Sequence, residues 1–205
     1  MRLTVEFLQK ADSFFNPCGE RQLNLRGFKI PAIENFGVLR DAFDAVDLTD
    51  NVIRVLGGFP TSYRLKALLL SRNEISHISP NLREQVPKLD TLVLSQNKIE
   101  DRNELNSLVG MPITRLVLMG NPIAEQQNYR LYVAHLLPLL KVLDFQKITQ
   151  SERQQAEALF GKSPFPTDLT SARPKPLRKK DTPSMTSSSA FTPGEFASAS
   201  SSSTK

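Results

Sequence analysis

The sequence has little of what secreted and membrane proteins contain. Its single cysteine, Cys18, cannot form an internal disulfide, whereas secreted repeat proteins usually pin their ends with disulfides. No Asn-x-Ser/Thr glycosylation acceptor is present, and the first ten residues, which include Glu6, lack the pattern of a secretory signal. No run of eighteen apolar residues occurs, so no membrane span is predicted. We therefore expect the chain to work in a reducing compartment, the cytosol or the nucleus.

Residues that could perform catalysis or bind a metal are also sparse. The two histidines, His77 and His135, fall in separate predicted elements, without a cysteine or carboxylate at ligand spacing. Cys18 has no histidine close to it in sequence that could act as a base, which argues against a nucleophile. No glycine-rich phosphate loop occurs. The sequence thus predicts no catalytic residue, no metal and no cofactor, and favours a binding module over an enzyme.

The positive charge is unevenly distributed along the chain. The net charge of the 205 residues is +5, and residues 163–205 contain six basic and three acidic residues. Residues 1–162 therefore carry a net charge of only +2. A folded domain so close to neutral lacks the basic surface of a protein that grips nucleic acid alone. Local basic residues could still assist a partner that binds nucleic acid.

One pattern recurs four times in the middle of the chain. It reads L-x-x-L-x-L-x-x-N-x-L, with Phe, Val or Ile replacing some leucines, and its asparagines are spaced by 22, 24 and 24 residues. This spacing is the signature of a leucine-rich repeat. The four copies span residues 43–53, 65–75, 89–99 and 113–123.

The physical meaning of the pattern predicts the fold. In the x-L-x-L part, a strand of period two points Leu68 and Leu70 to one side and Leu69 to the other. The asparagine amide can satisfy backbone groups that the turn would otherwise bury unpaired. No single repeat buries its own leucines, so neighbouring repeats must stack. We expect an α/β fold, a leucine-rich-repeat solenoid with a curved parallel sheet.

Both ends of the stack need a cover. Residues 4–15 read as a helix that Thr4 caps and Pro17 stops, and we interpret it as a lid over a degenerate first repeat at 21–30. A partner-docking helix is the alternative interpretation of residues 4–15.

The other end of the stack is predicted to be closed by a helical cap. The apolar pattern predicts a helix near 129–137, a strand at 140–145 that lacks the asparagine, and a helix at 151–160. Ser151 is the expected N-cap of that last helix, with Gln154 as its capping-box partner. These elements complete a predicted domain of residues 1–162.

The composition changes at residue 163. Residues 163–205 are rich in proline and serine, cannot bury enough apolar surface to offset ordering entropy, and are expected to be disordered. A basic cluster at 173–180 fits a nuclear import signal or a weak nucleic-acid patch, and equally a solvated charge run.

The period of the strands also predicts which side chains line the concave face of the sheet. Its middle is apolar, with Leu69, Val93, Val117 and Met119, and an exposed apolar stripe usually marks a docking surface. The alternative is that the tail or the cap covers this stripe within the chain. The predicted partner-binding residues are Arg26, Asp47, Thr49, Leu69, Ser71, Val93, Ser95, Val117 and Met119, with Arg115 at the rim.

Two runs of sequence resemble one family closely. The first, at 23–35 and 43–51, is similar to the first repeats of the A-prime family of the U2 small nuclear ribonucleoprotein. The second resembles the cap of the same family, at 121–122, 129–133, 142–147 and 152–157. The resemblance covers essentially residues 1–162, and the middle repeats and the tail depart from it.

The resemblance implies a function. Members of that family are scaffolds of the spliceosome in the nucleus, where they pair with an RRM protein of the B-double-prime type through the concave face and with other spliceosomal proteins. The pair binds a stem-loop near the 3′ end of U2 snRNA. Charge and rim position make Arg26, Lys29 and Lys147 the candidate RNA contacts. Capped repeats also occur in phosphatase regulatory subunits and dynein-type cytoskeletal adaptors, which remain the alternative.

Overall fold

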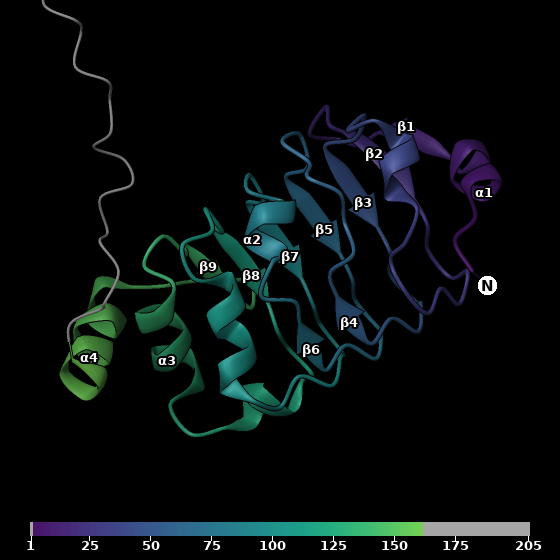
Figure 1. The fold of residues 1–205 in the computed structure, drawn as a ribbon. Coiled ribbons are helices and arrows are strands. Elements are labelled where there is room, and N and C mark those ends of the chain that lie inside the picture. The colour runs from purple at the N-terminus through teal and green to yellow at the C-terminus, as the bar shows by residue number, and fades with distance from the viewer. Residues whose placement is uncertain (1, 162–205) are drawn as a thin grey trace, which may run out of the picture. The chain divides into compact units, whose positions relative to one another are not determined.

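The computed structural model describes residues 2–161 (Figure 1). No helix among these residues is long and apolar enough to cross a bilayer. The expected disordered tail at 163–205, its basic cluster at 173–180 and the domain boundary at 162 lie outside the described residues, so they stay predictions.

The main element is a sheet of eight strands in the order β1-β2-β3-β5-β7-β8-β9-β10. From β2 to β9 every neighbouring pair is parallel, and the inward residues of successive strands stand in register. This arrangement confirms the predicted α/β leucine-rich-repeat fold. The strands are β1 (Ser13–Phe15), β2 (Arg21–Asn24), β3 (Ala45–Asp47), β5 (Ala67–Leu69), β7 (Thr91–Val93), β8 (Arg115–Val117), β9 (Val142–Leu143) and β10 (Gln146–Lys147).

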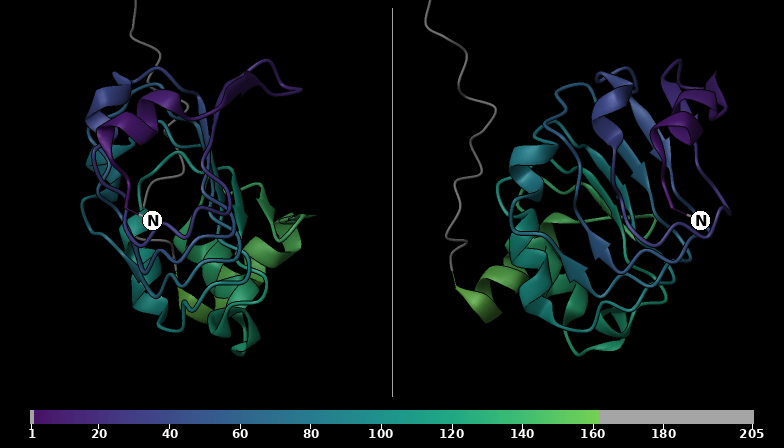
Figure 2. Two further views of the ribbon diagram at one scale, coloured as in Figure 1. Left: turned by 90° about the vertical axis from the view of Figure 1, so that its right-hand side faces the viewer. Right: turned by 45° about the vertical axis from the view of Figure 1, so that its right-hand side comes forward.

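The opposite side of each repeat is built from short elements (Figure 2). A short helical turn precedes Pro87, and the segment around Leu105 and Leu108 forms a 3-10 helix. The leucines that point inward from both sides form one apolar core. The elements of this side are η1 (Phe36–Leu39), β4 (Val55–Leu56), β6 (His77–Ile78), α2 (Leu82–Gln85), η2 (Arg102–Leu108) and η3 (Pro122–Glu125).

The four repeat asparagines form a buried hydrogen-bonded ladder. The Asn97 carbonyl oxygen accepts the Ile75 N–H at 3.0 Å, and its NH₂ group donates to the carbonyls of Leu70 and Leu94, both at 2.9 Å. Each amide thus joins its own repeat to the preceding one. The role predicted for these asparagines is confirmed, since Asn51, Asn73 and Asn121 make the equivalent bonds.

The residue before each of these asparagines has a left-handed backbone, which the repeat pattern alone does not indicate. Asp50, Arg72, Gln96 and Gly120 have φ values of 61°, 55°, 55° and 73°. This conformation turns the chain inward, so that the asparagine amide enters the core. In the degenerate first repeat Gly27 takes the same position, with φ 80°.

The N-terminal cover is a helix followed by a hairpin, and here the predicted helix 4–15 was too long. Helix α1 (Val5–Lys10) is capped by Thr4 as expected, and it buries Leu8 in the core. Residues 13–15 instead form β1, which pairs antiparallel with β2. A strand is favoured over a longer helix at residues 13–15 because β2 would otherwise leave its backbone groups unpaired at the edge of the sheet.

The C-terminal cover contains helices α3 (Tyr129–Leu136) and α4 (Gln150–Phe160). The expected cap of α4 was wrong by two residues, because Thr149 and not Ser151 is the N-cap. The Thr149 hydroxyl accepts the Glu152 N–H at 3.2 Å, and the Glu152 carboxylate accepts the Thr149 N–H at 2.7 Å. Glu152 therefore replaces Gln154 in the capping box, and the Arg130 side chain of α3 also donates to its carboxylate.

The strand predicted at 140–145 also ends early. It stops at Leu143, and Asp144 and Phe145 form a two-residue turn into β10. The Asp144 carboxylate accepts hydrogen bonds from the Leu118 N–H at 2.7 Å and from the Tyr129 hydroxyl at 3.0 Å. Burial and this carboxylate raise the pKa of Tyr129, so its phenol stays protonated and donates. The side chain of Asp144 thus ties the turn after β9 to the residue that follows β8 and to helix α3.

Candidate protein-binding face

The predicted concave residues do lie on one face of the main sheet, because paired residues of neighbouring strands share a face. Asp47, Leu69, Val93 and Val117 form one row in register across β3, β5, β7 and β8. Beyond the strand ends, backbone hydrogen bonds continue to join neighbouring repeats. The Arg72 N–H donates to the backbone carbonyl of Ser95, and the Gln96 N–H donates to that of Met119. We call this surface the concave face. Its second row contains Arg26, Thr49, Ser71, Ser95 and Met119.

The accessible apolar part of the concave face is smaller than the strand period predicts. Met119 is 48 % exposed, and Leu69 and Val93 are half-buried. Val117 and Thr49 are only 5 % and 8 % exposed, so they form the floor and offer little surface to a partner. The alternation of a strand predicts the face of a side chain, but its exposure depends on neighbours that the period does not specify.

The opposite part of the concave face, over the first repeats, is charged. The Asp50 carboxylate holds two arginines, with Arg26 Nε at 2.9 Å and Arg72 Nε at 2.7 Å. Ser71 and Ser95 close the row between the charged and apolar parts, with their hydroxyl oxygens 2.8 Å apart. Sequence reasoning identified Arg26 but missed Asp50 and Arg72, whose position before the asparagines was the available signal.

A second set of ion pairs lies where the strands begin. Asp44 accepts the Arg21 N–H and pairs with Arg64 at 3.0 Å, and the Arg64 hydrogen bonds lower the pKa of the Asp44 carboxyl. The predicted rim residue Arg115 pairs with Asp90 of the preceding repeat at 3.1 Å. These acidic residues fix basic side chains at the rim of the concave face.

The three candidate RNA contacts do not form one patch. Arg26 and Lys29 follow β2 near one end of the sheet, and Lys147 lies in β10 at the other end. Six strand steps separate β2 from β10, so the two groups stand on the order of 30 Å apart at about 4.8 Å per step. Any RNA that touches both groups must extend along the whole sheet.

The two histidines and the cysteine do not belong to the strands that form the concave face. His77 lies in β6 and His135 in α3. His77 Nδ1 is 3.0 Å from a Glu104 carboxylate oxygen, and the His135 ring packs near Phe160. Cys18 is exposed in the turn between β1 and β2. Among residues 2–161 no group of three or more histidine, cysteine, aspartate or glutamate side chains could hold a metal ion.

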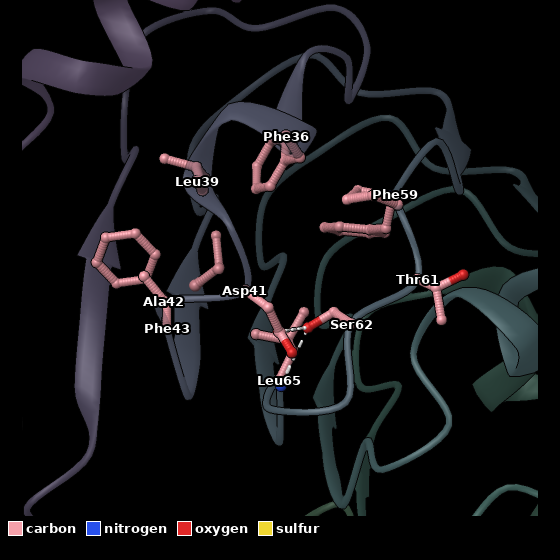
Figure 3. Close-up of a pocket in the computed structure, with 11 residues that line it drawn as sticks. Phe36, Leu39, Asp41, Ala42, Phe43, Phe59, Thr61, Ser62 and Leu65 are labelled. Carbon is pink, nitrogen blue, oxygen red and sulfur yellow. Dashed lines mark hydrogen bonds between the residues drawn. The ribbon is translucent and has the colours of Figure 1, made fainter.

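A small cavity lies where β3 and β5 begin (Figure 3). Its walls are mainly apolar, with Phe36 and Phe59 packed edge to face at 5.2 Å. Its one carboxylate, Asp41, accepts hydrogen bonds from the Ser62 hydroxyl and from the backbone N–H groups of Tyr63 and Arg64. Asp41 therefore braces the loop between two repeats and is not placed for acid–base chemistry.

Comparison with known proteins agrees with this geometry. A leucine-rich repeat family matches residues 1–165. The U2 small nuclear ribonucleoprotein A′ of Schizosaccharomyces pombe is 44 % identical over 173 residues, which cover 84 % of this chain and 72 % of the relative. That of Aspergillus fumigatus is 45 % identical over 172 residues, which cover 83 % and 68 %.

A solved structure is similar as well. The crystal structure of the Drosophila melanogaster SNF/U2A′ complex contains a chain 43 % identical to this one, with a TM-score of 0.76 over 78 % of this chain and 92 % of that chain. These matches do not favour a phosphatase regulatory subunit or a dynein-type adaptor. The repeat fold, the cap and the identities together assign the chain to the U2 small nuclear ribonucleoprotein A′ family of leucine-rich repeat proteins.

Proposed function

We propose that this chain is a non-catalytic scaffold of the U2 small nuclear ribonucleoprotein in pre-mRNA splicing in the nucleus. It holds an RRM protein of the B-double-prime type on its concave face and helps that partner bind a U2 snRNA stem-loop. The observation that carries the proposal is the accessible apolar surface of Leu69, Val93 and Met119 on the sheet of a chain of this family. The Drosophila relative supports it, since that protein was solved in a complex with SNF.

The dimensions of the apolar part fit a single helix of the partner. Leu69, Val93 and Val117 lie on three neighbouring strands, which span about 10 Å. An α-helix with its side chains is about 10–12 Å wide. One helix therefore covers the apolar part, and the charged residues around Asp50 lie at its border as polar rim contacts.

The low net charge of residues 1–162 supports the proposal that the partner makes most of the RNA contacts. With a net charge of +2, residues 1–162 supply few phosphate contacts, and Arg26, Lys29 and Lys147 are the candidates. Holding the partner in one orientation lowers the entropic cost of binding RNA. The pair is then expected to bind its stem-loop more selectively than the partner does alone.

Replacing Leu69 and Val93 by aspartate tests the concave face. Each carboxylate would be buried without a partner in the interface, so binding of the purified RRM partner should weaken at least about a hundredfold. The matched control is Val55→Asp, at an exposed position on β4 of the opposite side. Undiminished binding by variants that keep the circular dichroism spectrum and melting temperature of the wild type would exclude the concave face.

A further inference from the structure

The turn between β9 and β10 carries a phenylalanine where the backbone does not favour one. Leu143 pairs with Gln146, so Asp144 and Phe145 form a two-residue loop, with φ values of 49° and 63°. Both values are positive, as in a type I′ turn, whose usual residues are asparagine and glycine. A bulky residue with positive φ is strained. The fold would thus be satisfied by a smaller residue at position 145.

The Phe145 side chain does not offset this backbone strain by packing against the rest of the protein. It is 75 % exposed, more than any other large apolar side chain among residues 2–161. An aromatic ring left in water gains nothing from the hydrophobic effect. Strain in the backbone and exposure of the ring both act against stability, so the position points to a role in binding.

The backbone that carries Phe145 is nevertheless firmly held. Asp144 is bonded to the Leu118 N–H and to the Tyr129 hydroxyl. Arg130 donates to the carbonyl of Leu143 at 3.1 Å and to that of Lys147 at 2.9 Å, on both sides of the turn. A ring presented on such a braced turn loses little conformational freedom when a partner covers it.

The turn also lies beside the end of β8, next to the residue that precedes Met119. In the preceding repeat, the Leu94 N–H donates to the backbone carbonyl of Val117 in the next strand. At Leu118 the Asp144 carboxylate takes the place of that carbonyl, so the turn stands where a further strand would run. The neighbour of Leu118 in sequence is Met119, which is the most exposed residue of the apolar part.

From these observations we infer that Phe145 is an aromatic anchor for the protein partner, beyond the last parallel strand. This inference rests on the proposed function and adds a specific residue to it. The partner whose apolar helix lies on Leu69, Val93 and Met119 also covers the Phe145 ring, next to that helix. Aromatic side chains that a partner buries are among the residues that contribute most to binding energy.

The variant Phe145→Asn separates binding from folding, because asparagine tolerates a left-handed backbone. In the full chain, we expect its melting temperature to equal or exceed that of the wild type, while affinity for the purified RRM partner falls at least about tenfold in titration calorimetry. Phe145→Tyr keeps the ring and should bind within about threefold of the wild type. The matched control is Phe15→Asn, which removes a ring that is 72 % exposed at the opposite end of the sheet and should not change affinity.

Two results would overturn the inference. Suppose that the partner binds the wild type, fails to bind the Leu69→Asp variant, and binds Phe145→Asn as tightly as the wild type. This result would exclude Phe145 as an anchor and leave the proposed function standing. A clear fall in the melting temperature of Phe145→Asn would show that the ring stabilises the chain itself. If the wild type itself fails to bind the RRM partner, the proposed function fails first.

Discussion

At the scale of single residues, buried amides hold this fold together more than surface charges do. Asn97 is buried and bonded on both sides, to the repeat before it and to its own. The pair of Arg54 and Glu74, at 3.2 Å, also joins two repeats, but the arginine is largely exposed. Exposed pairs contribute about 0–1 kcal/mol, whereas a buried polar group left without its partner costs about 1–3 kcal/mol.

The variant Asn97→Ala should therefore destabilise the domain strongly. It leaves the Ile75 N–H and the carbonyls of Leu70 and Leu94 without this partner, and we expect the free energy of unfolding to fall by about 2–4 kcal/mol. Urea unfolding followed by circular dichroism measures the change. The control, Lys98→Ala, removes an exposed neighbour and should change stability by less than about 0.5 kcal/mol. Equal losses in both variants would contradict the importance of the asparagine ladder.

The sequence alone predicted the role of a single residue only where that role recurs in every repeat. The four asparagines recur at fixed spacing, so their common function could be inferred without coordinates. The left-handed residues before them, such as Arg72, vary in identity, so only their position before each asparagine could mark them. The burial of Thr49 and Val117 depends on side chains of neighbouring repeats, which a pattern of period two does not specify.

At the scale of elements, the errors of prediction lie at the two ends of the stack. The interior repeats support one another, so their pattern predicts their structure. At the ends the choice depends on what the outermost strand requires. The exposed edge of β2 favours β1 over a longer helix, and Arg130 of α3 favours Glu152 as the capping partner in α4. Tertiary contacts of this kind cannot be derived from local propensity.

The same cap makes stability depend on pH. Hydrogen bonds from Arg130, followed in importance by those from Thr149, lower the pKa of Glu152 from 4.5 to about 2. A carboxyl whose pKa is lower in the folded state stabilises the fold fully above its unfolded pKa. That contribution is lost as the pH falls from about 4.5 toward 2.

The variant Glu152→Gln tests this linkage. At pH 7 we expect it to be less stable than the wild type by about 1–3 kcal/mol, because Arg130 loses its ionic partner and the capping box is weakened. The difference should shrink as the pH is lowered from 5 to 2.5, since the wild type then protonates Glu152. Melting temperatures across this range measure it. Glu157→Gln, which removes an exposed carboxylate from the same helix, serves as control, and a difference that stays constant with pH would refute the assignment.

At the scale of the whole described domain, two sets of side chains have different roles. The leucines and asparagines make the stack, and the ion pairs arrange charge along its rims. The concave face is charged over the first repeats, around Asp50, and apolar over the last ones, around Met119. On the proposed function, a partner on this face has to match both parts at once, which would select one orientation of that partner.

The separation of the RNA candidates leads to the last prediction, on the dependence of RNA binding on salt. Each phosphate contact contributes about 0.7–0.9 to the slope of log K against log salt. If Arg26 and Lys29 both contact phosphates, alanine at both positions should lower the slope of the complex of this chain with its RRM partner by about 1.4–1.8. The slope is measured by filter binding of the U2 snRNA stem-loop between 50 and about 300 mM salt.

The single variant Lys147→Ala then reports on the other end of the sheet. A stem-loop held at one end only would leave the slope of this variant unchanged, whereas RNA extended along the sheet would lower it by about 0.7–0.9. Arg83→Ala, an exposed position in α2 on the opposite side, is the control for net charge. If all three variants keep the slope of the wild type, this chain contributes orientation alone, and every phosphate contact belongs to the partner. That result would fit the low net charge of residues 1–162, and it would make the concave face the sole route by which this chain affects RNA binding.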